Sequence, residues 1–117
     1  MFQMKNLIIV PDGLIPLDSD FAAYYGFTSE NYYEETYLVG DSSLKQVTIP
    51  MLISNHPGEG RFSKAIKKML EDGIRVSIPT PVPKMQEILS VWGFEVVWIP
   101  EEGIEYWVYP PYDAKAK

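Results

Sequence analysis

Residues 55–79 read NHPGEGRFSKAIKKMLEDGIRVSIP, a glycine-containing loop followed by a helical pattern and then a short apolar run. The periodicity of residues 61–72 predicts an amphipathic helix with one buried stripe, ended by Gly73. Residues 74–79 then predict a buried strand, because their apolar residues alternate. The helical stripe consists of Phe62, Ala65, Ile66, Met69 and Leu70.

The sequence on the carboxyl side continues this alternation of helix and strand. After a proline-rich connection, residues 84–92 predict a second helix that ends at Gly93. Residues 94–99 and 104–109 predict two strands joined by a turn at 101–103, which together form a β-hairpin.

A further strand precedes the glycine-containing loop at residues 44–54, where Pro50 predicts an edge or a bulge. The order of strand, helix, strand, helix and hairpin predicts an α/β layer with parallel neighbours, closed by antiparallel strands. The chain has 117 residues, which predicts one domain with a core of its own.

The first 43 residues give shorter signals. Residues 6–10 predict a strand, followed by a turn at 11–13 and a short apolar return that contains Leu14, Ile15 and Leu17. An acidic stretch rich in aromatic residues comes next. It predicts a short helix at 19–25 capped by Ser19 or Asp18, a strand at 32–39 and a turn at 40–43.

Composition excludes several classes of site. The chain has no cysteine and one histidine, His56, so we expect no disulfide, no cysteine nucleophile and no metal centre. Its net charge is −6, without the basic face that nucleic-acid binding requires, so no nucleic-acid partner is expected. The apolar runs are far shorter than a membrane span and no signal-peptide layout is present, which predicts a cytoplasmic protein without a membrane partner.

The loop before the first clear helix has the composition of a phosphate-binding loop. Gly58 and Gly60 would let a diphosphate approach the backbone N–H groups at the positive end of the helix. Arg61, Lys64 and Lys68 follow along the solvent stripe of that helix and would add positive charge. A plain turn is the alternative, because glycines before helices are common.

The order of elements and these motifs together give a resemblance to a known family. Asn55, Gly58 and Gly60 match a loop of Gln or Arg, two residues, Gly, one residue, then Gly or Ala, with Asn at the first position. Trp92-Gly93-Phe94 stands where the family has Leu-Gly-Phe at the end of its second helix. In these features, residues 46–109 resemble the acetyl-CoA-binding half of the GNAT superfamily of N-acetyltransferases.

This resemblance implies a GNAT-like mixed sheet, mostly antiparallel, with a splayed central parallel pair and flanking helices. Residues 1–43 would form a variable acceptor-side part, 44–110 the acetyl-CoA-binding half and 111–117 a tail. Acetyl-CoA or coenzyme A would bind at the splay, and the acceptor would be a small-molecule or peptide amine. The implied cofactor-binding residues are Met51, Leu52, Ile53, Asn55, Gly58, Gly60, Arg61 and Lys64.

The expected catalytic groups are only partly present. The family's tyrosine general acid would fall at Leu89, and a common asparagine at Val82, so neither position carries the expected group. A replacement acid would come from Tyr24, Tyr25, Tyr32, Tyr33 or Tyr37. Candidate bases are His56, Glu34 and Glu35, the last two pointing to opposite faces if residues 32–39 are extended. For each of these three residues, the alternative is an exposed residue without a catalytic role.

These departures leave a second functional class open. The alternative to an N-acetyltransferase is a catalytically inactive binding or structural protein with the same fold, of the size of a phage or mobile-element accessory protein. We also expect a homodimer, because the aromatic strand at 104–109 would otherwise be an exposed apolar edge.

Overall fold

Six strands form one mixed sheet in the order β1-β2-β3-β4-β6-β5, in a computed structural model that describes residues 8–51 and 60–111. Only β3 and β4 are parallel neighbours, and every other pair is antiparallel. The elements in chain order are β1 (Gly13–Ile15), α1 (Asp20–Tyr24), β2 (Tyr37–Asp41), β3 (Gln46–Met51), α2 (Arg61–Glu71), β4 (Arg75–Pro79), α3 (Pro83–Val91), β5 (Glu95–Ile99) and β6 (Ile104–Tyr109). The predicted α/β class, with helices on a mixed and mostly antiparallel sheet, is therefore confirmed.

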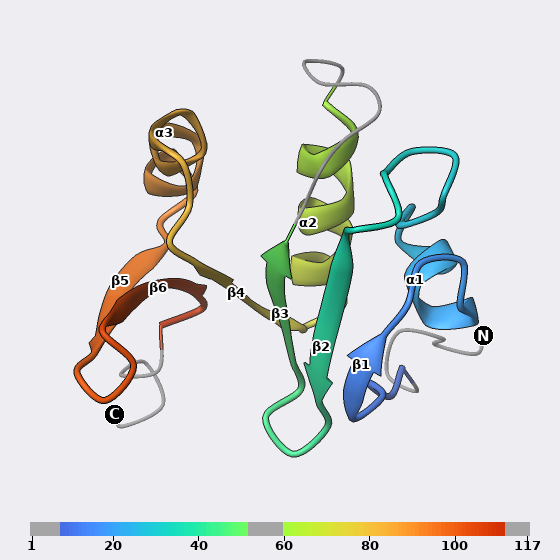
Figure 1. Ribbon diagram of the computed structural model, residues 1–117, viewed down its shortest axis with the longest axis horizontal. Coiled ribbons are helices and arrows are strands. Elements are labelled where there is room, and N and C mark those ends of the chain that lie inside the picture. Colours follow the sequence, from blue (N-terminus) through green and yellow to red (C-terminus); the bar gives the residue numbers. More distant parts are fainter. Residues whose placement is uncertain (1–7, 52–59, 112–117) are drawn as a thin grey trace.

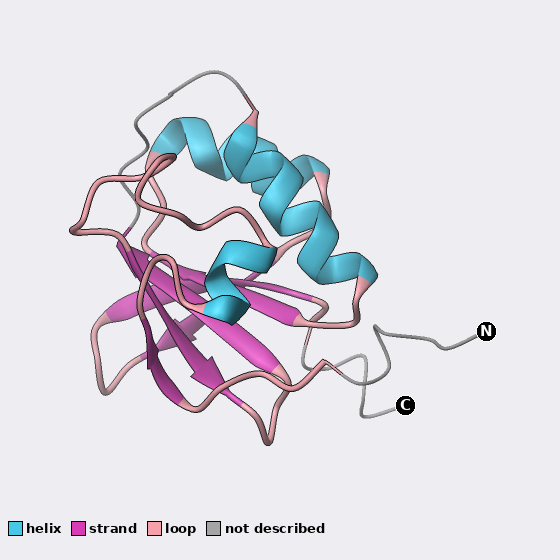
Figure 2. Cartoon of the chain, turned by 90° about the vertical axis from the view of Figure 1, so that its right-hand side faces the viewer, coloured by secondary structure: helices cyan, strands magenta, loops and turns pink. Residues whose placement is uncertain are grey.

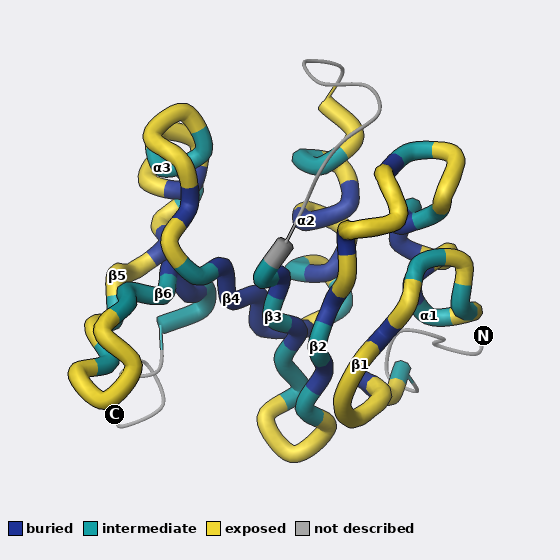
Figure 3. Tube along the Cα trace, in the orientation of Figure 1, coloured by how far each residue is buried: buried dark blue, intermediate teal, exposed yellow. Residues whose placement is uncertain are grey.

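The three described helices lie on one side of the sheet, as Figure 2 shows. The buried residues, dark blue in Figure 3, concentrate where α1 and α2 meet the central strands and where α3 meets β4 and β6. Among them Ile66 and Met69 of α2 and Leu89 of α3 are fully buried, as are Val47 and Val76 of the parallel pair. The opposite face of the sheet is covered by no helix among the described residues.

Several local predictions are confirmed. Helix α2 buries Ala65, Ile66 and Met69 of the predicted stripe, and Gly73 ends it with a φ of 82°. Helix α1 begins after Ser19, whose side chain accepts a hydrogen bond from the backbone N–H of Ala22 at 3.3 Å. Such an N-cap satisfies one of the free donors at a helix start.

Three strand predictions are wrong in part. Residues 8–10 are not extended strand, and the first strand is β1, three residues further on; positions 6 and 7 lie outside the described residues. Residues 33–36 form a turn in which the Thr36 N–H donates to the Tyr33 carbonyl at 2.9 Å, so β2 begins only at Tyr37. Leu44 and Lys45 belong to the turn before β3. At residues 33–36 and 42–45, a local backbone hydrogen bond closes a turn where the side-chain pattern alone would extend a strand.

The aromatic strand β6 is not an edge. It lies between β4 and β5, pairing with β4 from Val76↔Tyr109 to Pro79↔Tyr106 and with all five residues of β5. The reason given above for a homodimer, an exposed edge at residues 104–109, is therefore wrong. Self-association itself stays a prediction.

Candidate functional site

The two central parallel strands stay paired over only part of their length. Their register runs from Gln46↔Arg75 to Thr48↔Ser77, after which β3 continues to Met51 without a further β4 partner. Here the β2–β3 register also shifts, between Tyr37 and Val39 on β2, which agrees with a bulge near Pro50. The alternative prediction, an edge strand, is wrong because β3 pairs with both β2 and β4. Pro50 has no N–H to offer a neighbouring strand, which accounts for the end of the pairing.

Helix α2 starts at the end of the molecule to which β3 and β4 run (Figure 1). Its N-cap, Gly60, is left-handed with a φ of 77° and gives no side-chain cap, and its first turn has no acidic residue. The free N–H groups of a first turn carry partial positive charge, which attracts anions. The divergence of β3 and β4 and an uncapped helix start therefore occur at the same end of the molecule.

The three predicted basic residues of α2 line one pocket of about 470 Å³, shared with residues of α1 and the loop after it. Arg61 is exposed and donates a 2.7 Å hydrogen bond to the Asn31 side-chain oxygen. The Lys68 ammonium donates to the Tyr24 carbonyl at 3.1 Å and lies 3.9 Å from the centre of the Tyr24 ring. This basic pocket lies on the side of α2 that faces α1, next to the uncapped first turn.

Much of the predicted cofactor set lies outside the described residues. This applies to Leu52, Ile53, Asn55 and Gly58, and to the candidate base His56. Met51 is the last residue of β3, and of its position only the backbone is described. Gly60, Arg61 and Lys64 lie at the start of α2, where Arg61 and Lys64 line the basic pocket.

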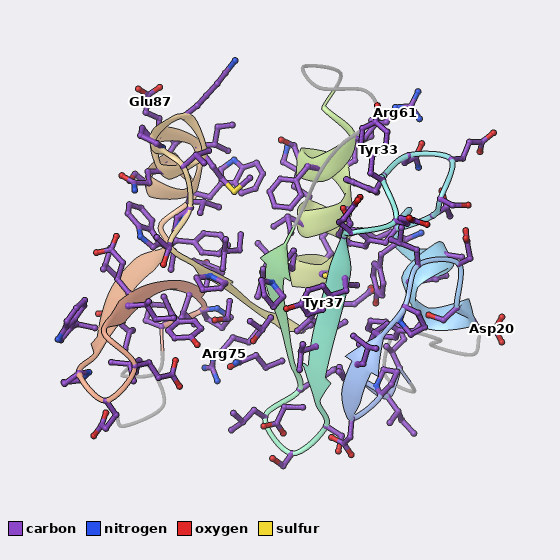
Figure 4. All side chains as sticks on the ribbon, in the orientation of Figure 1. Asp20, Tyr33, Tyr37, Arg61, Arg75 and Glu87 are labelled. Atoms are coloured by element: carbon purple, nitrogen blue, oxygen red, sulfur yellow. The ribbon has the colours of Figure 1, made fainter. Side chains whose placement is uncertain are left out.

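The two predicted glutamate bases do not lie on a strand. Glu34 and Glu35 are exposed residues of the 33–36 turn, so the prediction that they point to opposite faces of a strand is wrong. Neither lines a described pocket at the divergence. In the view of Figure 4, Tyr37 lies at the level of the central strands.

The five candidate tyrosines separate into two groups. Tyr25 is buried, and burial together with its 2.8 Å hydrogen bond to Asp72 raises the pKa of its hydroxyl far above the ordinary value. Tyr32 is 1% exposed and burial raises its pKa to about 12. Tyr24, Tyr33 and Tyr37 stay accessible. Tyr37 is paired across the β2–β3 register with Met51, so it is the accessible tyrosine at the strand divergence.

A second pocket, of about 440 Å³, lies on the helix-free face under the same strands. It extends from Pro50, where β3 leaves β4, to Glu102 and Tyr106, whose hydroxyl donates a 2.6 Å hydrogen bond to the Glu102 carboxylate. Sequence reasoning missed this pocket. The sequence does contain an indication of it, because polar and apolar residues alternate along β3 and β4. Gln46, Thr48 and Ser77 therefore share the face opposite the core.

The Tyr32 hydroxyl is buried without a hydrogen-bond partner among the described residues. Because its folded-state pKa of about 12 lies above the ordinary value of 10.0, the folded state favours the protonated phenol. The stabilisation that the protonated Tyr32 phenol gives the folded state is fully present below pH 10 and is lost between pH 10 and 12. The free energy of unfolding should therefore fall steeply over this interval.

Tyr32→Phe is expected to keep or raise stability at neutral pH, by up to about 1 kcal/mol, because it removes an unpartnered buried hydroxyl. Tyr32→Phe should also reduce the fall in the free energy of unfolding above pH 10. Urea unfolding of Tyr32→Phe and of Tyr33→Phe, whose side chain is 55% exposed, gives the comparison. A clear destabilisation of Tyr32→Phe at neutral pH would mean that the hydroxyl is satisfied.

Comparison with protein-family models, with curated proteins and with solved structures finds no match for this chain. None of the described helices has both the length and the apolar character to cross a membrane. Within residues 8–51 and 60–111, no group of three or more metal-ligating side chains is gathered. Function must therefore be argued from the geometry above.

Proposed function

We propose that the chain binds acetyl-CoA or coenzyme A where β3 and β4 diverge, in the manner of the GNAT superfamily, and transfers the acetyl group slowly to an amine. The observation that carries this proposal is the coincidence of two features. The parallel pairing stops at Thr48↔Ser77, and the uncapped first turn of α2 lies at the same end of the molecule.

The sheet supports the proposal at the level of topology. The resemblance implies a mostly antiparallel sheet, one central parallel pair and a terminal hairpin next to that pair. The observed strand order has one parallel pair, β3 with β4, and the β5–β6 hairpin pairs with β4 through β6.

The ligand would use two sets of backbone groups. Its diphosphate would accept hydrogen bonds from the first turn of α2, with Arg61 and Lys64 adding positive charge. Its pantetheine arm would run beside the end of β3, where Met51 has no strand partner on the β4 side. Leu52, Ile53, Asn55 and Gly58 remain proposed contacts on the residues that follow.

The acceptor amine would enter through the pocket on the helix-free face. Glu102 and Tyr106 give that pocket an acidic wall suited to a cationic amine, and Pro50 brings it to the divergence of the strands. In the reaction the bound ammonium group first loses a proton to solvent, and the neutral amine attacks the thioester carbonyl. The C–S bond then breaks, the nitrogen loses its second proton and the coenzyme A thiolate takes one up, so that an amide and a thiol form. Holding both reactants at the divergence would supply much of the acceleration.

The catalytic groups predict slow transfer. Leu89, at the position of the implied tyrosine acid, is fully buried in α3 and has no proton to give. A positioned acid contributes about 100- to 10,000-fold. A thiolate is a tolerable leaving group, because a thiol has a pKa of about 8.5. The absence of the general acid should therefore slow transfer by a factor toward the lower end of that range. Tyr37 is the accessible tyrosine at the divergence and takes over as our candidate acid.

An inactive coenzyme A-binding protein is the second candidate. The observation that favours it is the location of Glu34 and Glu35, in an exposed turn instead of on a strand at the divergence. In that case the fold would keep the ligand site and would have lost transfer.

A thiol-release assay with acetyl-CoA and a panel of amines, polyamines and lysine peptides separates the two candidates. We expect release slower than about 1 per second, reduced further by Tyr37→Phe. Tyr33→Phe is the matched control, since Tyr33 is also an exposed tyrosine but lies in the 33–36 turn. Binding without any release would favour the inactive protein. Fast release unaffected by Tyr37→Phe would contradict the assignment of Tyr37.

A further inference from the structure

Strand β5 forms one of the two edges of the sheet. Its five residues pair with β6 on one side, and among the described residues no strand pairs with it on the other (Figure 1). An edge strand presents unpaired N–H and C=O groups to an incoming chain. The opposite edge, β1, is only three residues long, which limits pairing there.

Exposed apolar side chains accompany this edge. Trp98 and Val96 of β5 are 58% and 47% exposed, and both are on the sheet face that carries the helices. Val91, at the end of α3, is 84% exposed, and Ile88 of α3 is 37% exposed. The Phe94 N–H donates to the Leu89 carbonyl at 3.0 Å, which joins the end of α3 to the start of β5. We call Ile88, Val91, Val96 and Trp98 the α3–β5 surface.

The part of the chain that carries this surface is acidic. Residues 82–109 contain five acids and one base, Lys84, a net charge of −4. Glu105 is directly opposite Trp98 in the β5–β6 register, and Glu95 is on β5 itself. A second copy of this chain would bring the same acidic charge to the contact, whereas a basic partner would be attracted. The acids are Glu87, Glu95, Glu101, Glu102 and Glu105.

We propose that β5 receives an extended segment of a partner protein in which apolar residues alternate with Lys or Arg. The segment adds a seventh strand to the sheet through the free backbone groups of β5. Its apolar side chains pack on Val96 and Trp98, and its basic side chains lie near Glu95 on β5 and Glu101 in the turn that follows β5. This interaction is separate from the coenzyme A site and does not depend on it.

A synthetic peptide of about nine residues in which valine alternates with lysine tests the proposal. We expect a dissociation constant of tens to hundreds of micromolar, weakening as salt is raised. The largest changes in amide chemical shift should fall on residues 95–99. An otherwise identical peptide with glutamate in place of lysine should bind at least about tenfold more weakly.

Trp98→Lys should weaken binding of the valine–lysine peptide at least about tenfold. Leu14→Lys is the matched control, because Leu14 is 66% exposed on the other edge strand. The double variant Glu95→Gln, Glu101→Gln changes charge at exposed positions only and should weaken binding most at low salt.

Four results would each overturn the proposal. The first is the absence of peptide binding at millimolar concentration. The second is equal binding of the lysine and glutamate peptides, and the third is equal loss of binding in Trp98→Lys and Leu14→Lys. The fourth is a dimer, seen by sedimentation, that Trp98→Lys dissociates, because a second copy would then occupy this edge.

Discussion

Gly40→Val is expected to destabilise the protein by about 3 kcal/mol or more, enough to unfold much of a marginally stable domain. A Cβ at position 40 would overlap the carbonyl oxygen of Pro11 and come within 2.9 Å of Ile15 Cδ1 and Val10 Cγ1. The obstacle is backbone, which cannot rotate away as a side chain can. Urea unfolding monitored by circular dichroism measures the loss.

Gly103→Ala is the control for this prediction. Gly103 has a φ of 69°, and a Cβ there would meet nothing within 4 Å, so its replacement costs backbone strain alone, on the order of 1 kcal/mol. If Gly40→Val unfolded at the same urea concentration as Gly103→Ala, the close approach of residues 10–11 to β2 would be refuted.

Gly60→Val is expected to weaken coenzyme A binding at least about tenfold, or about 1.4 kcal/mol. A side chain on this left-handed N-cap would stand in the approach of a phosphate to the first turn of α2. A Cβ there meets no protein atom within 4 Å, so the effect on binding would not come from a clash within the protein.

Gly73→Val is the matched control for Gly60→Val. Both glycines flank α2 with positive φ, 82° at Gly73 and 77° at Gly60, so both variants carry similar backbone strain. Only Gly60 lies at the end of α2 where the ligand is proposed to bind. Isothermal titration should give unchanged affinity for Gly73→Val, and equal loss in the two variants would mean that strain, not phosphate approach, weakens binding.

The second half of the chain could be predicted from the sequence because its helices bury apolar stripes at regular spacing. Helix α2 is observed at Arg61–Glu71 against a prediction of 61–72, and β6 has the predicted bounds Ile104–Tyr109. Glycines at positive φ mark the ends of both long helices. In this half, local pattern and tertiary packing agree.

The first half could not be predicted in the same way. The sequence predicts a turn that starts at Gly40, yet Gly40 lies inside β2, where the close approach of residues 10–11 leaves no room for a Cβ. A glycine required by a neighbouring segment has the same local signal as a glycine required by a turn. Likewise, the side-chain pattern of residues 33–36 does not distinguish a turn from a strand, although a backbone hydrogen bond from Thr36 to Tyr33 closes a turn there.

The parts of the candidate site that lie within one segment of the chain could be predicted from the sequence. The parts formed where distant segments meet were missed. The basic stripe of α2 follows from helical spacing. The pairing of Tyr37 with Met51 and the pocket that joins Pro50 to Glu102 depend on strand order, which the sequence alone did not fix in detail. The edge position of β5 depends on the same strand order.

Isothermal titration of the unmodified protein with coenzyme A tests the central claim most directly. The account predicts saturable one-to-one binding with a dissociation constant in the micromolar range or tighter. Bound ligand should also raise the unfolding temperature. No heat of binding and no rise in unfolding temperature at millimolar coenzyme A would contradict the proposed ligand site.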